Sequence, residues 1–256
     1  MTIIDPTTPL GAIVTDHPSL ARRLEGLGLD YCCGGRRSLG EACADRGLDP
    51  VAVAADLEAA AEPAEPEPWA TMAPEELVDH LESVHHAYLH RELPRLEALM
   101  AKVDDVHGAH HPELAFVRAT FEELVADLDP HLAKEERILF PAIRRQVDPD
   151  AAPFDVGPPV RVMLVEHDRA GELLARLRAL TGGYAPPSDA CASYRALYAG
   201  LDELEADTHL HVHKENNVLF PAVLERRRVV GGTDAAAPAC DGPGTHVGCP
   251  GAEGRG

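Results

Sequence analysis

The sequence predicts an all-α protein, in which a small helical domain over residues 1–61 precedes an up-down-up-down four-helix bundle over residues 74–228. Composition is the first reason. Aromatic residues make up only 4% of the chain, whereas alanine, leucine and glutamate are abundant, and this balance favours helices over sheets. Apolar residues also recur at helical spacing, and the apolar fraction of 45% is enough for a core.

A repeated motif is the second reason, and it carries candidate metal ligands. Residues 131–141 and 211–221 each begin with histidine, have glutamate four positions later and end in Leu-Phe-Pro. On a helix, a histidine and a glutamate at this spacing lie on one face about one turn apart. One such pair could arise by chance in a chain with 14 histidines, but two copies in register make chance improbable.

The repeat extends backward along the chain. An offset of 80 or 81 positions relates the members of the two halves, pairing His211 with His131, Glu215 with Glu135, and His167 with His86. Each half therefore offers one lone histidine followed by a His-x-x-x-Glu pair.

The first domain is expected to contain a helix opened by Pro18, with leucines at helical spacing and glycines at positions 26 and 28 marking its end. A turn follows over residues 29–37, where Gly34 and Gly35 free the backbone. Ser38 can then cap the next helix through Glu41.

Two adjacent cysteines, Cys32 and Cys33, lie in this turn. The nearby Arg36, Arg37 and helix N-terminus would lower a thiol pKa, so the pair could be reactive or could bind a soft metal. The alternative is that both are small buried apolar residues. A disulfide between neighbours would strain the peptide and is not expected. Cys43 falls on the following helix, where a core position is expected.

Residues 62–73 are expected to form a linker, because residues 62–68 alternate proline with glutamate and alanine. The tail over residues 229–256 has little to bury and is expected to be disordered. The tail contains Cys240, His246 and Cys249, which could chelate a metal ion weakly. This is the lesser alternative, because no second cysteine pair completes a zinc site.

Each of the four long helices of the bundle is expected to carry its candidate ligands on an apolar seam. The first seam joins His86 to Leu89, Leu93, Leu96 and Met100. The second, on a helix over residues 113–145, joins Phe121, Leu124, Leu128, His131, Glu135 and Ile138. The third joins Val160, Met163, Leu164, His167, Gly171 and Leu174. The fourth, over residues 190–227, joins Leu197, Leu201, Leu204, His211, Glu215 and Val218.

A buried carboxylate such as Glu135 needs a cation, and a metal ion is the economical one. Four imidazoles and two carboxylates divide into two histidines per metal, with both glutamates bridging. This mixed nitrogen and oxygen set suits iron, manganese or zinc, and its open positions suit small diatomic molecules. The remaining candidates are expected at the surface or around the ligands: His80, His85, His90, His209 and His213.

The formal charge of −20 argues against nucleic acid or an anionic membrane as a partner, because both would be repelled. The N-terminus has no basic segment followed by an apolar stretch, and no run of about 18 apolar residues occurs. These features predict a cytoplasmic protein with no membrane segment.

At residues 30–35 the sequence reads Asp-Tyr-Cys-Cys-Gly-Gly, and Glu-His-Asp stands at 166–168 between the two repeats. Over residues 8–226 this combination resembles the di-iron iron-sulfur cluster repair proteins, the Repair of Iron Centers family. The resemblance implies an N-terminal Cys-Cys-Gly-Gly domain and a hemerythrin-like bundle. The family's di-iron ligands fall on the residues already reached from spacing, namely His86, His131, Glu135, His167, His211 and Glu215.

The resemblance further implies repair of iron-sulfur clusters damaged by nitrosative or oxidative stress, through iron donation, nitric oxide chemistry at the di-iron centre, or both. A nitric oxide reductase-like activity would be the enzymatic form. The cofactor would be two non-haem iron ions bridged by oxo and carboxylate groups. Implied partners are damaged iron-sulfur proteins, with nitric oxide or oxygen as small ligands. Functional roles are implied for Glu166, Cys32 and Cys33.

Two other functions stay open. One is an oxygen or nitric oxide binding or sensing module without repair activity, and the other is a structural bundle that binds no metal. The Cys-Cys unit favours repair, because a plain carrier needs only the bundle. A homodimer is compatible with the sequence, which does not decide the oligomeric state.

Overall fold

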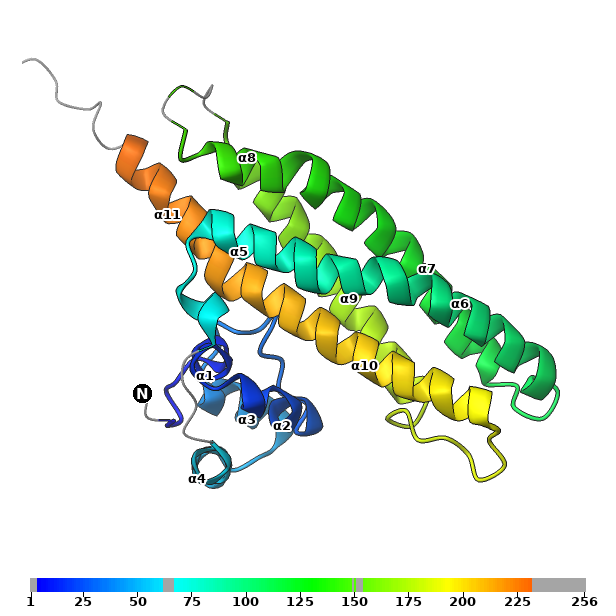
Figure 1. The fold of residues 1–256 in the computed structure, drawn as a ribbon. Helices are drawn as coiled ribbons and strands as arrows, with labels where there is room; N and C mark the ends of the chain where they lie inside the picture. Colours follow the sequence, from blue (N-terminus) through cyan, green and yellow to red (C-terminus); the bar gives the residue numbers. More distant parts are fainter. Residues whose placement is uncertain (1–3, 62–66, 149, 151–153, 232–256) are drawn as a thin grey trace, which may run out of the picture.

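The computed structural model describes residues 4–61, 67–148, 150 and 154–231. Within these ranges every regular element is a helix, and the one extended pairing is an isolated bridge between Pro9 and Ser38. The prediction of an all-α fold is confirmed. Figure 1 shows a long bundle with a small group of helices packed on one side of it. No helix in the described ranges is long and apolar enough to cross a membrane.

The small group is the N-terminal unit. It comprises α1 (Leu10–Asp16), a 3₁₀ turn η1 (Pro18–Leu20), α2 (Ala21–Gly26), α3 (Leu39–Arg46) and α4 (Pro50–Ala60). Ser38 and Glu41 form the expected capping box at the start of α3, and Cys43 is fully buried. The apolar core of the unit continues into the bundle through Val212, which docks the unit on α10.

The bundle consists of four long rods in sequence. The first is α5 (Pro74–Leu81), η3 (Glu82–His86) and α6 (Ala87–His107), and the second is α7 (Leu114–Lys134), η4 (Glu135–Leu139) and α8 (Phe140–Arg145). The third is α9 (Gly157–Leu180), and the fourth is α10 (Ala192–Lys214), η5 (Glu215–Leu219) and α11 (Phe220–Gly231). Contacts join α7 to α9, α9 to α10, α10 to α6 and α6 to α7, so the four rods enclose one core.

Three π-helical turns, η3, η4 and η5, interrupt the bundle helices where the candidate ligands lie. A π turn adds one residue and shifts every later side chain around the helix. The prediction that Ile138 continues the second seam is therefore wrong. Ile138 is 50% exposed, and Leu139 takes the buried position instead. In the fourth rod, Leu219 is fully buried in the same way, whereas Val218 is only half-buried.

Two apolar clusters fill the bundle on either side of the candidate ligands. The larger cluster includes Leu96, Phe121, Leu174 and Leu201. The other includes Leu81, Phe140, Met163 and Phe220. Between them lie the buried polar groups, so the site is placed in the interior and away from both ends of the bundle.

Part of the expected linker is structured. Residues 62–66 lie outside the described residues, but Pro68–Thr71 forms a 3₁₀ helix, η2, in which Trp69 is buried. The Trp69 ring lies 5.1 Å from the Lys214 ammonium and packs edge-on against His213. Residues 232–256, with Cys240, His246 and Cys249 of the predicted tail, also lie outside the described residues, while α11 extends to Gly231.

Candidate dinuclear metal centre

The six residues expected to bind metal converge in the middle of the bundle. Their donor atoms fall into two groups, in each of which all atoms lie within 4.8 Å of one another. One group is His86, Glu135, His211 and Glu215, and the other is His131, Glu135, His167 and Glu215. All six residues are buried. Both groups share Glu135 and Glu215, as a carboxylate-bridged pair of metal ions requires.

The imidazole Nε2 atoms all face the carboxylates. The Glu135 Oε2 atom lies 3.3 Å from His131 Nε2 and 3.5 Å from His86 Nε2. The Glu215 carboxylate lies 3.0 Å from His167 Nε2 and 3.2 Å from His211 Nε2. The four rings and two carboxylates therefore surround a common interior volume.

Three of the four rings are fixed from behind by a hydrogen bond at Nδ1. The Nδ1–H of His86 donates to Glu136 Oε1 at 3.0 Å, and that of His131 donates to Glu166 Oε2 at 2.9 Å. In His167 the same atom donates to Asn216 Oδ1 at 2.8 Å. Because ionised carboxylate and amide oxygens only accept, Nδ1 must carry the proton. This leaves the Nε2 lone pair free to bind a metal.

The protein groups alone leave the interior unsatisfied. No hydrogen bond reaches either oxygen of Glu135, Oε2 of Glu215 or Nε2 of His86, although all four atoms are buried. The Nε2 atoms of His131 and His167 face each other at 3.2 Å, and with both ring protons on Nδ1 their two lone pairs meet there without a proton between them. Buried polar atoms without partners are costly, and cations placed among them would satisfy every one. The residues present therefore fit a dinuclear metal centre.

Electrostatics support the same conclusion. Burial would lower the pKa of His86 and of His167, but the neighbouring carboxylates outweigh burial and raise each pKa to about 9. Burial lowers the pKa of His211. Burial opposes ionisation of Glu215, yet His211 and His167 hold its pKa well below the usual range. Bound metal would take over the charge compensation that protonated imidazoles otherwise supply.

A cavity of about 200 Å³ reaches the site from the α7–α9 side. Its lining includes His131, His167 and His211, with Glu166 and Lys134 beside them. Glu166 is ion-paired with Lys134 and hydrogen-bonded to His131. Burial would raise the Glu166 pKa, but Lys134 and His131 outweigh burial and lower it. Glu166 thus lies behind a ligand and at the cavity wall; a catalytic role stays a prediction.

Among the described residues, the other histidines do not join either donor group, but two of them are more deeply buried than a surface position allows. His85 is 2% exposed and stacks on His211, with ring centroids 5.4 Å apart. His213 is fully buried between Tyr31 and Trp69. A buried lysine, Lys214, lies 2.8 Å from the Nε2 atoms of His80 and His85. Sequence reasoning missed Lys214, because its burial depends on Trp69 arriving from the predicted linker.

The cysteine pair lies where the N-terminal unit meets the bundle. The Sγ atoms of Cys32 and Cys33 are 3.9 Å apart and both thiols are free, as expected. The prediction of a lowered thiol pKa is wrong for Cys32, because the adjacent Cys33 thiol and burial raise its pKa. Arg37 is engaged by Asp45, and Arg36 is exposed.

Two asparagines connect the cysteine turn to the candidate metal centre. The Nδ2 groups of Asn216 and Asn217 donate to the carbonyl oxygen of Cys32 at 3.4 and 3.0 Å. Asn216 is also the residue that holds His167. These asparagines occupy positions that are glutamate and arginine in the first repeat, and this difference between the repeats is the sequence signal that could have found them.

Comparison with known proteins agrees with this geometry. The Hemerythrin HHE cation binding domain matches residues 77–223, and a Domain of Unknown function (DUF542) matches residues 6–61. The iron-sulfur cluster repair protein YtfE of Enterobacter sp. (strain 638) is 37% identical over 84% of this chain and 96% of its own. The protein of the same name from Escherichia coli O157:H7 is 35% identical over 84% of this chain and 96% of its own.

A third relative, from Haemophilus influenzae, is named a probable iron-sulfur cluster repair protein. It is 34% identical over 85% of this chain and 97% of its own. The matched segments include both the cysteine turn and all six residues of the two donor groups. The chain therefore belongs to the family of iron-sulfur cluster repair proteins with a hemerythrin-like cation-binding domain.

Proposed function

We propose that this protein repairs iron-sulfur clusters damaged by nitrosative or oxidative stress, and that it does so with a non-haem di-iron centre in the bundle. The observation that carries the proposal is the pair of donor groups sharing Glu135 and Glu215. The names of the relatives add the substrate class, damaged iron-sulfur proteins. Such clients are expected in the cytoplasm.

The proposed ligands are His86 and His211 for one iron and His131 and His167 for the other, with both glutamates bridging. Iron bound there would supply one-electron redox chemistry and open positions for a small ligand such as nitric oxide or oxygen. Two imidazoles and two shared carboxylates leave each ion short of six ligands, which also favours release of iron over permanent storage.

The protein's own residues control access and orientation. Glu136, Glu166 and Asn216 hold three imidazoles by their Nδ1–H groups, so the Nε2 atoms stay directed at the centre. The apolar clusters exclude bulk water from both ends, and the cavity of about 200 Å³ limits entry to small molecules. Glu166, 31% exposed at that cavity, can exchange a proton between solvent and the neighbourhood of His131.

The alternative is a module that binds oxygen or nitric oxide without repair. The docked cysteine turn favours repair, because its hydrogen bonds through Asn216 connect a thiol pair to a ligand of the centre. A simple carrier has no use for such a connection.

Reactivation of an iron-sulfur enzyme previously damaged with nitric oxide tests the proposal. Iron-loaded protein should restore the enzyme's activity, and elemental analysis should find about two iron atoms per chain, one for each donor group. The variant Glu135→Ala should lose the iron and the repair. The control Asp129→Asn, an exposed position on α7 in the same rod, should keep both. Reversible nitric oxide binding without reactivation would support the carrier function, and zinc in place of iron would overturn the proposed centre.

A further inference from the structure

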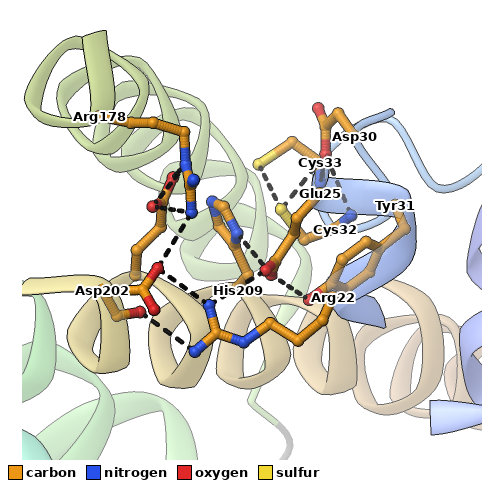
Figure 2. Close-up of polar contacts among 10 residues, drawn as sticks. Arg22, Glu25, Asp30, Tyr31, Cys32, Cys33, Arg178, Asp202 and His209 are labelled. Atoms are coloured by element: carbon orange, nitrogen blue, oxygen red, sulfur yellow. Dashed lines mark hydrogen bonds and ion pairs between the residues drawn. The ribbon is translucent and has the colours of Figure 1, made fainter. Parts of the chain in front are cut away.

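A second set of side chains with metal-ligating atoms lies in the cysteine turn, outside the two donor groups of the bundle. The donor atoms of Asp30, Cys32 and Cys33 all lie within 4.8 Å of one another. Figure 2 shows the two thiols side by side, with the Asp30 carboxylate next to them. The Cys32 Sγ atom is 3.9 Å from Cys33 Sγ and 3.2 Å from Asp30 Oδ1. Adjacent cysteines would ordinarily point apart in an extended chain, so the turn holds them together.

The backbone fixes the carboxylate in place. The N–H groups of Cys32 and Cys33 donate to Asp30 Oδ1 at 3.0 and 2.9 Å, and that of Gly34 donates to Oδ2 at 3.0 Å. Gly34 is required there, since a Cβ atom would lie 2.8 Å from the Asp30 carbonyl oxygen. The three donors are therefore preorganised without the help of any ligand.

The spacing fits a tetrahedral ion. With metal–sulfur bonds of about 2.3 Å, two thiolate sulfurs on a tetrahedral ion lie about 3.8 Å apart. With a metal–oxygen bond of about 2.0 Å, a thiolate sulfur and a carboxylate oxygen lie about 3.5 Å apart. The observed separations are 3.9 and 3.2 Å. An ion could thus be seated by shifts of a few tenths of an ångström.

The turn faces a cavity of about 690 Å³ between the N-terminal unit and the helices α9 and α10. Cys33 reaches toward α9, where its sulfur would lie 3.8 Å from a Cβ atom at Gly171, an ordinary van der Waals distance. Carboxylates outnumber guanidinium groups in the cavity lining, five to two, and Asp168 and Glu172 are exposed. The cavity is therefore favourable to cations and leaves the fourth position of a tetrahedral ion open.

A polar network keeps the turn at the cavity. As Figure 2 shows, Glu25 accepts hydrogen bonds from Tyr31 and from His209 of α10, both at 3.0 Å. Arg22 reaches Asp202 at 3.2 Å, and Asp202 also pairs with Arg178 of α9 at 3.3 Å. Since residues on both sides of the cavity are tied together, the thiols have a fixed position relative to the bundle.

We propose that Asp30, Cys32 and Cys33 form an additional metal site, which binds a thiophilic divalent cation and leaves one position open to the cavity. On binding, each thiol loses its proton to solvent, so one divalent ion replaces two protons and forms two metal–thiolate bonds. The identification of the ion as Fe²⁺, in transit between the bundle and a client, rests on the proposed function. The site itself does not.

Anaerobic titration of the full-length protein with Co²⁺ tests the site, because thiolate ligation gives cobalt an intense charge-transfer absorption that nitrogen and oxygen ligands do not give. We expect this absorption to report one equivalent of cobalt per chain, in addition to the cobalt that the bundle binds. In Cys33→Ser the affinity for this equivalent should fall by more than about tenfold, since losing a ligand costs at least as much as losing its outer partner. Cys191→Ser, an exposed cysteine elsewhere, should behave like the parent protein.

The double variant Glu135→Ala with Glu215→Ala separates this site from the bundle centre. It should lose the cobalt bound by the bundle and keep the thiolate absorption. X-ray absorption of that cobalt should show two sulfur neighbours at about 2.3 Å, a result that does not depend on whether a cysteine variant folds. Absence of thiolate absorption in the parent protein, or an unchanged cobalt affinity of this absorption in Cys33→Ser, would overturn the proposal. A parent protein that shows the thiolate absorption but does not reactivate a damaged iron-sulfur enzyme would count against the proposed function alone.

Discussion

The shared role of Glu135 gives the sharpest prediction. In Glu135→Gln the side chain keeps its shape but loses its charge, and it belongs to both donor groups. In the metal-free protein the effect on stability should be small, within about 1 kcal/mol, because a neutral side chain costs less to bury and the imidazoles that Glu135 holds protonated can release their protons once its charge is gone. No hydrogen bond to the Glu135 oxygens is lost. The metal-loaded protein should differ.

Metal at about 1,000 times its dissociation constant stabilises a protein by about 4.1 kcal/mol. Outer partners of metal ligands contribute about 10- to 100-fold to affinity, so a shared ligand should contribute at least about 100-fold. A 100-fold weaker affinity removes about 2.7 kcal/mol of this stabilisation, since each tenfold is about 1.4 kcal/mol. At about 2–4 °C per kcal/mol for a chain of this size, the metal-induced rise in Tm should shrink by about 5–11 °C.

Thermal unfolding with and without Fe²⁺ under anaerobic conditions measures this difference. Asp129→Asn is the matched control, because it removes one carboxylate charge from an exposed position on α7. It should show the full metal-induced rise. An undiminished rise in Glu135→Gln would refute the shared-ligand assignment, and a large loss of stability without metal would show that Glu135 has a structural role instead.

Three further predictions concern other parts of the molecule. Glu166→Ala removes the acceptor that holds a ligand imidazole, so metal affinity in competition with a chelator should fall about 10- to 100-fold, and an unchanged affinity would make Glu166 a cavity residue only. The backbone N–H of Tyr194 and the His107 ring lower the Cys191 pKa to about 7. The rate of Cys191 alkylation, measured by peptide mapping, should therefore rise through pH 7 in the parent protein. In His107→Ala the same rise should come at higher pH. Trp69→Ala should cost about 3–5 kcal/mol in urea unfolding, because the ring is buried; a loss below about 1 kcal/mol would mean that η2 contributes no core.

The cysteine pair shows where local reasoning fails. Two arginines and a helix N-terminus near Cys32 suggest a lowered thiol pKa. The Cys32 pKa is raised instead, because Cys32 is buried beside Cys33 and Arg37 pairs with Asp45. The sequence shows neither the burial nor the ion pair. Burial and pairing of this kind depend on contacts between segments about 180 residues apart, such as those of Asn217 with the turn.

The sequence by itself determined the helical class and the six residues of the donor groups. This was possible because an α-helix repeats every 3.6 residues, so that a histidine and a glutamate four apart on an apolar seam must lie on one buried face. A duplicated motif then identified both halves of the candidate site without any long-range contact being known.

Only the tertiary structure decided the rest. The π turns at Glu135 and Glu215 shift the later side chains by one position, which a uniform helical period cannot anticipate, and Ile138 is exposed for this reason. Which histidine shares a donor group with which, and which residue holds each ring, depends on how four separate helices pack. The positions of Asn216 and of the cysteine turn likewise follow from docking of one unit on another, which local periodicity does not encode.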